Sequence, residues 1–176
     1  MTNYRRIQTP GGTYFFTVNL ARRRNTTLLV EQIDVLRNAF RTVKTSHPFH
    51  IDAIVILPDH LHAIWTLPAD DGDYAKRWSL IKSGFSRSIP QGEYRSKSRM
   101  KRRERGIWQR RFWEHRIRDH EDMRKHIDYI HWNPVKHGYV THVQDWPHSS
   151  FHGYVDRGLL PQDWAGGDGG LDLTGE

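Results

Sequence analysis

The chain has 176 residues, with 27 Lys and Arg against 20 Asp and Glu, a net charge of +7 and no cysteine. The length fits one domain, and the lack of cysteine excludes disulfides, thiolate zinc sites and a cysteine nucleophile. The longest apolar run, 53–57, is far shorter than a membrane span, and residues 1–12 lack the apolar stretch of a signal peptide. We therefore expect a soluble, cytoplasmic protein.

The first half of the chain alternates between strand and helix patterns. Residues 14–20 are aromatic and β-branched, which predicts a strand, and a basic loop follows at 22–24. Apolar residues at helical spacing predict a helix over 31–45. Two short β-rich runs, 49–57 and 60–67, are separated only by Pro-Asp and predict an antiparallel hairpin.

A second helix is predicted over residues 73–88, with Asp73 as its cap, and a strongly basic stretch follows it. Between Arg95 and Arg111 there are nine basic residues and one acid, and aromatic residues flank the run. Guanidinium groups can hold phosphates while aromatic rings stack on bases, so nucleic acid is the expected partner. The alternative is a solvated loop. The candidate DNA-binding residues are Arg22, Arg23, Arg24, Lys101, Arg102, Arg103, Arg105, Trp108, Arg110 and Arg111.

The last elements are a strand and a helix. Residues 107–117 predict a fourth strand, and Asp119 can cap a third helix that Pro134 interrupts or restarts and Gly138 ends. The element order β-α-β-β-α-β-α predicts an α+β fold of the ferredoxin-like split βαβ type. In this fold an antiparallel sheet carries helices on one face, here with an added C-terminal helix.

Two histidines form a candidate metal-binding pair. Side chains alternate along a strand, so His60 and His62 lie on one face with attachment points about 6.6 Å apart, and both could reach one ion. Leu61 would then point to the core. The alternative is a pair of histidines on a solvated strand face. Asp59 could orient the His60 imidazole, or it could be a turn residue after proline.

A tyrosine and an asparagine lie one helical turn apart. Tyr129 and Asn133 share a face of the third helix, so a phenol and a carboxamide could both face an ion held by the strand. Tyr129 could instead be a half-buried helix residue, and Asn133 could be the cap before Pro134.

Three segments together carry a family resemblance: LPDHLHAIW at 57–65, WQRRFWEH at 108–115 and YIHWNPVKHG at 129–138. In this order they resemble the single-tyrosine HUH transposases, and most closely the branch associated with repetitive extragenic palindromes. The resemblance covers about residues 14–154 and implies a transposase domain over 1–157. Residues 158–176, rich in Gly and Asp, have too little apolar content to pack, and we expect a flexible tail.

The resemblance implies a site and a reaction. His60 and His62 would bind the metal, Asn133 would be the third ligand, and Tyr129 on the C-terminal catalytic helix would be the nucleophile. Nitrogen and oxygen ligands suit Mg²⁺ or Mn²⁺. The substrate would be single-stranded DNA hairpins of repetitive extragenic palindromes, cut through a 5′-phosphotyrosine intermediate by a monomer or homodimer with no membrane partner.

Two other classes stay open. A non-catalytic nucleic-acid-binding module would present Tyr14, Phe15 and Phe16 on its sheet for base stacking. A metal-dependent hydrolase would use the histidine pair with water, and Tyr129 would be dispensable.

Overall fold

The computed structural model describes residues 8–166, and residues 1–7 and 167–176 lie outside that range. Four strands form one antiparallel sheet in the order β2-β3-β1-β4, as in the split βαβ fold predicted above. The strands are β1 (Thr13–Asn19), β2 (His50–Ile56), β3 (His60–Thr66) and β4 (Trp113–Arg116).

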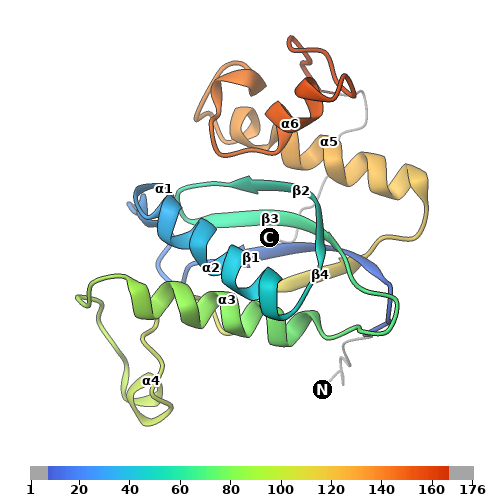
Figure 1. The fold of residues 1–176 in the computed structure, drawn as a ribbon. Helices are drawn as coiled ribbons and strands as arrows, with labels where there is room; N and C mark the ends of the chain where they lie inside the picture. Colours follow the sequence, from blue (N-terminus) through green and yellow to red (C-terminus); the bar gives the residue numbers. More distant parts are fainter. Residues whose placement is uncertain (1–7, 167–176) are drawn as a thin grey trace, which may run out of the picture.

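Helices cover both faces of the sheet: α2 and α3 pack on one face, and α5 lies across the other (Figure 1). Within residues 8–166 no helix is long and apolar enough to cross a membrane. The helices are α1 (Leu28–Glu31), α2 (Ile33–Ser46), α3 (Tyr74–Ser88), α4 (Lys97–Lys101), α5 (His120–Lys136), the 3-10 helix η1 (Val143–Asp145) and α6 (Phe151–Asp156).

The two central strands, β1 and β3, are buried on both faces because each face has a helical cover. Phe16, Leu61 and Trp65 belong to the larger core beneath α2 and α3, which confirms the inward direction predicted for Leu61. Phe15 and Ile64 belong to the smaller core beneath α5. The alternation of side chains along β3 therefore directs its histidines toward α5.

Three predicted elements differ from the structure. The strand expected over 107–117 is ordered as a strand only over Trp113–Arg116, because Trp108 makes a single isolated bridge to Leu20 and the chain then leaves the ladder. The helix expected over 31–45 begins earlier, as the short α1, and is divided at Gln32. The basic stretch contains a short helix, α4, that the charge pattern does not reveal.

The predicted interruption at Pro134 is wrong, because α5 runs through this residue to Lys136. A proline lacks only its own N–H bond, and this one lies in the last turn, where few bonds are lost. The next bond is intact, since the His137 N–H donates to the Asn133 carbonyl at 3.0 Å. Gly138, with a φ of +72°, ends the helix in the left-handed conformation.

The chain after α5 returns to the free edge of β2. The Ile56 N–H donates to the His148 carbonyl at 2.9 Å, and the Ser150 N–H donates to the Ile54 carbonyl at 2.8 Å. This segment therefore covers backbone groups that an edge strand would otherwise expose.

The first part of the predicted tail, residues 158–166, packs against the domain. The Trp164 ring lies 6.1 Å from the Phe151 ring and 6.2 Å from the His131 ring, between centroids. One tryptophan thus anchors a stretch whose composition indicates flexibility. The rest of the predicted tail lies outside the described residues.

Candidate active site

His60 and His62 lie at the start of β3, paired with Asn19 and Thr17 of β1. Both side chains are buried, and their ring centroids are 4.9 Å apart. The alternative of a solvated strand face is therefore wrong, because α5 covers this face of the sheet.

In each of the two imidazole rings, a hydrogen bond at Nδ1 fixes the orientation of the ring. His60 Nδ1 lies 2.6 Å from Asp59 Oδ1, and His62 Nδ1 lies 2.9 Å from Thr17 Oγ1. A carboxylate only accepts, so His60 Nδ1 donates to Asp59, and in the neutral ring Nε2 carries the lone pair. His60 Nε2 is buried and has no hydrogen-bond partner among residues 8–166. This is the arrangement that metal-binding histidines adopt.

Asp59 is held as a carboxylate between two partners that donate to it. Its Oδ2 accepts a hydrogen bond of 2.8 Å from Arg23 Nε, while its Oδ1 faces His60. Burial alone would raise the pKa of Asp59, but the hydrogen bonds to His60 and Arg23 outweigh it and hold that pKa well below its usual range. Asp59 thus orients His60, and Arg23, a predicted DNA-binding residue, is bound to the site.

His62 is a neutral imidazole at pH 7. Burial, and then the positive charge that His60 can carry, hold the pKa of His62 well below its ordinary value of 6.5. The neutral form is the one that ligates metal ions.

The helix α5 brings Tyr129 to the histidines and carries Asn133 one turn further along. The Tyr129 ring lies 5.3 Å from the His62 ring and 6.0 Å from the Phe15 ring, between centroids. Asn133 is fully buried, and neither of its side-chain polar atoms has a hydrogen-bond partner among the described residues. The capping alternative for Asn133 is wrong, because α5 neither stops nor restarts there.

Two further residues of α5 and its end lie at the site. Lys136 Nζ lies 3.5 Å from the Tyr129 hydroxyl and 4.7 Å from the centre of that ring. The His137 ring lies 5.2 Å from the His60 ring, between centroids. The spacing offers a signal for Lys136, since i+7 from Tyr129 is two turns along the same helical face.

The donor set fits a divalent ion. His60 Nε2 and the Asn133 carboxamide are buried polar atoms without partners among the described residues, and such atoms are rare unless a ligand, ion or water satisfies them. Two imidazole nitrogens and a carboxamide oxygen, with no sulfur, suit Mg²⁺ or Mn²⁺ and leave coordination positions for a substrate.

A second group of possible ligands lies at the other end of α5. One ligand atom each of His115, Asp122 and His126 lies within 4.8 Å of the others. His115 Nε2 lies 2.9 Å from Asp122 Oδ2, and Arg118 Nε donates to the same oxygen at 3.2 Å. Burial raises the pKa of Asp122, but these hydrogen bonds outweigh it and lower the pKa to about 2. The carboxylate is thus satisfied by the protein, and the group fastens β4 to α5.

The predicted DNA-binding residues divide into exposed and engaged side chains. Arg105 pairs with Glu93, just before the basic stretch, through two contacts of 2.7 Å, and Trp108 is buried. Arg110 pairs with Glu104 at 2.9 Å. The others, apart from Arg23, are exposed: Arg22, Arg24, Lys101, Arg102, Arg103 and Arg111.

The aromatic residues that a binding module would present are all buried. Tyr14 and Phe16 lie in the core under α2 and α3, and Phe15 lies under α5. None can stack on a base, so the sheet is no platform of the RNA-recognition kind.

Similar proteins match over nearly the whole chain, although no family model matches it. Two curated relatives bear the name REP-associated tyrosine transposase, in one case as a putative member. That one, from Haemophilus influenzae, is 49% identical, and the match covers 100% of this chain and 99% of the relative. The one from Escherichia coli is 50% identical, and the match covers 94% of this chain and 92% of the relative.

A solved structure agrees with these relatives. It is a REP-associated tyrosine transposase bound to a REP hairpin, 48% identical, with a TM-score of 0.82 over 98% of this chain and 96% of that one. Sequence and fold thus agree over nearly the full length of each protein. The chain belongs to the family of REP-associated tyrosine transposases.

Proposed function

We propose that the chain cuts and rejoins single-stranded DNA at hairpins of repetitive extragenic palindromes, with Tyr129 as the nucleophile. The observation that supports this most directly is the position of Tyr129, whose ring lies 5.3 Å from that of the metal-binding candidate His62. A hydrolase that activates water would not need Tyr129 beside His62.

The reaction exchanges one phosphodiester bond for another. The Tyr129 oxygen forms a bond to the scissile phosphorus, and the bond from phosphorus to the 3′ oxygen breaks. Tyrosine gives up its proton and the 3′ oxygen takes one up, which leaves a 5′-phosphotyrosine and a free 3′-hydroxyl. Because the bond energy is kept in the intermediate, a 3′-hydroxyl can reverse the step without an external energy source.

His60, His62 and Asn133 would hold the divalent ion, Mg²⁺ or Mn²⁺. When bound, it polarises the non-bridging phosphate oxygens and stabilises the charge that develops in the transition state. The chain's own contribution is to orient the imidazoles, since Asp59 fixes the proton of His60 on Nδ1 and Thr17 holds the Nδ1 of His62.

Lys136 acts on the nucleophile. A phenol with an ordinary pKa near 10 is mostly neutral at pH 7. An ammonium 3.5 Å from the Tyr129 oxygen favours the phenolate electrostatically and so raises the fraction that can attack.

The substrate follows from the relatives and the charge. A similar protein of known structure is bound to a REP hairpin, and the exposed cations Lys101, Arg102 and Arg103 offer phosphate contacts on the basic stretch. We place this activity in the cytoplasm, because the named relatives come from bacteria, which hold their genomic DNA there. The sequence predicts that the chain acts as a monomer or a homodimer.

The test compares Tyr129→Phe with Tyr139→Phe, an exposed tyrosine ten residues further along the chain. Hairpins labelled at the 5′ or 3′ end are incubated with each ion and separated on denaturing gels. We expect wild type and Tyr139→Phe to cut and to form a covalent adduct. Tyr129→Phe should do neither, while binding the hairpin as tightly as wild type.

A cutting Tyr129→Phe variant would contradict the proposal and favour the hydrolase. His60→Ala separates the ion from the nucleophile, because it should abolish cleavage and leave hairpin binding intact. Equal cleavage by wild type with and without a chelator would show that the reaction needs no metal ion.

A further inference from the structure

Asn19, the last residue of β1, lies on the face of the sheet that α5 covers. It pairs with His60 in the ladder between β1 and β3, just as Thr17 pairs with His62. Thr17 Oγ1 lies 2.9 Å from His62 Nδ1, so alternation along β1 directs the Asn19 side chain to the same face. The two sequence neighbours of Asn19 belong to the core on the opposite face, as this alternation requires. The Asn19 side chain is therefore the cross-strand neighbour of His60.

The side chain of Asn19 carries a buried acceptor that no donor satisfies. Its Oδ1 is buried and has no hydrogen-bond partner among residues 8–166, although the residue as a whole is half-buried. Buried polar atoms in proteins rarely stay unsatisfied, so such an atom beside a site points to a ligand. An amide oxygen only accepts hydrogen bonds, so the ligand must offer a proton or a positive charge.

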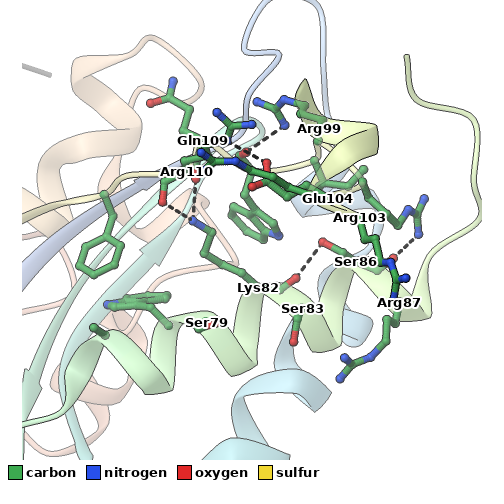
Figure 2. A pocket seen from close by; sticks show the side chains of 18 residues that line it. Ser79, Lys82, Ser83, Ser86, Arg87, Arg99, Arg103, Glu104, Gln109 and Arg110 are labelled. Atoms are coloured by element: carbon green, nitrogen blue, oxygen red, sulfur yellow. Dashed lines mark hydrogen bonds and ion pairs between the residues drawn. The ribbon is translucent and has the colours of Figure 1, made fainter. Parts of the chain in front are cut away.

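Backbone hydrogen bonds hold this part of the chain from two sides. The Gln109 N–H donates to the Asn19 carbonyl at 3.0 Å, and the Leu20 N–H donates to the Asp59 carbonyl at 2.9 Å. Gln109 is itself held by α3, because Lys82 Nζ donates to its carbonyl at 2.6 Å (Figure 2). The carboxamide is thus presented by a fixed backbone, which suits a group that positions a substrate atom.

Asn19 and the nucleophile lie toward opposite ends of the site. The Tyr129 ring lies 6.0 Å from the Phe15 ring and 5.3 Å from the His62 ring, between centroids. Asn19 comes four residues after Phe15 on β1, which at about 3.3 Å per residue is about 13 Å further along the strand. In a displacement at phosphorus the attacking and leaving oxygens lie roughly in line. With Tyr129 attacking, the leaving 3′ oxygen therefore faces the end of the site that holds Asn19 and His60.

We infer that Asn19 Oδ1 accepts a hydrogen bond from the 3′-hydroxyl that cleavage releases. The inference rests on the proposed function and assigns a residue to its leaving group. At the cut, the sugar–phosphate backbone offers one donor only, which is this hydroxyl, because the oxygens of the phosphodiester carry no proton at pH 7.

Asn19 stays neutral in both directions of the reaction. In cleavage, the bond from phosphorus to the 3′ oxygen breaks and its electron pair stays on that oxygen. A proton from solvent completes the hydroxyl, which then donates to Asn19. In rejoining, the hydroxyl held by Asn19 gives up its proton to solvent, its oxygen bonds to phosphorus, and the Tyr129 oxygen leaves. A 3′ end that is held in place attacks far more readily than one that diffuses away.

The first test measures the hydrogen bond without chemistry. The probe is the cleavage product that ends at the cut, made with either a 3′-hydroxyl or a 3′-hydrogen. Its affinity is measured by fluorescence anisotropy with a chelator present. Asn19→Ala removes the carboxamide, and Asn19→Leu keeps most of its volume should the first variant fail to fold. Asn38→Ala is the matched control, because Asn38 is exposed on α2.

We expect wild type and Asn38→Ala to bind the 3′-hydroxyl product about threefold to tenfold more tightly than the 3′-hydrogen product. The Asn19 variants should bind both products equally, with the affinity that wild type has for the 3′-hydrogen product. If wild type makes no distinction between the two ends, or if the Asn19 variants keep the distinction, the inference is wrong.

The second test uses rejoining and the dependence on the ion. The covalent adduct of Asn19→Ala should need about threefold to tenfold more 3′-hydroxyl strand than wild type for half-maximal rejoining. The ion concentration for half-maximal cleavage should stay within twofold of wild type. A higher ion requirement with an unchanged preference for the hydroxyl would make Asn19 a ligand of the ion and overturn the inference. If wild type forms no covalent adduct, the proposed function itself fails.

Discussion

Replacing Asp59 by Asn tests how the metal-binding pair is held. The carboxylate accepts from His60 Nδ1 at 2.6 Å and from Arg23 Nε at 2.8 Å. An amide keeps the shape but has one acceptor oxygen, so one of these two bonds must be lost. A hydrogen-bond partner that orients a metal-binding histidine raises metal affinity about 10–100-fold. A hydrogen bond to a charged group contributes about 1.5–3 kcal/mol to stability.

We therefore expect Asp59→Asn to raise the ion concentration for half-maximal cleavage about 10–100-fold and to lower the free energy of unfolding by about 1.5–3 kcal/mol. Titration of cleavage with Mg²⁺ and with Mn²⁺, beside urea denaturation, measures both. Asp52→Asn is the control, since Asp52 bonds Thr66 at the far end of β3. A half-maximal concentration within twofold of wild type would make Asp59 a simple turn residue.

Three further outcomes are expected. Lys136→Met should slow cleavage roughly tenfold to a hundredfold. It should also shift the pH–rate profile to higher pH, since the phenolate then forms only at higher pH. An unshifted profile would show that Lys136 does not act on the tyrosine. Replacing Lys101, Arg102 and Arg103 by Ala should flatten the salt dependence of hairpin binding by about 0.7 in slope for each phosphate that is no longer neutralised. An unchanged slope would make the basic stretch a solvated loop. Burial lowers the pKa of His131 from 6.5 to about 3, so below pH 6.5 the unfolded chain takes up a proton that the folded chain does not. The free energy of unfolding should then fall by about 2 kcal/mol between pH 6.5 and 5, and urea denaturation of His131→Gln should show that much less of a fall.

Much of the fold could be predicted because local pattern and tertiary burial agree. Alternation along 60–67 placed Leu61 in the core and both histidines on the opposite face, and the structure has that arrangement. The cap at Asp73 follows from a side chain that can accept the Lys76 N–H, which it does at 2.9 Å.

The missed features depend on contacts between residues far apart in sequence. The composition of residues 158–166 predicts a flexible segment, yet the Trp164 ring packs beside Phe151. Charge makes Arg23 a phosphate-binding candidate, yet it pairs with Asp59, 36 residues away. Proline statistics place a break at Pro134, but a single missing bond near a helix end does not stop the helix.

Every group of the candidate site comes from one polypeptide. The histidines lie on β3, and Tyr129 reaches His62 from the α5 of the same chain, which also carries Asn133. Two inactive variants, one lacking His60 and one lacking Tyr129, should therefore not complement each other, because each site would still lack one of the two residues. A mixture of the two should therefore stay inactive at any ratio.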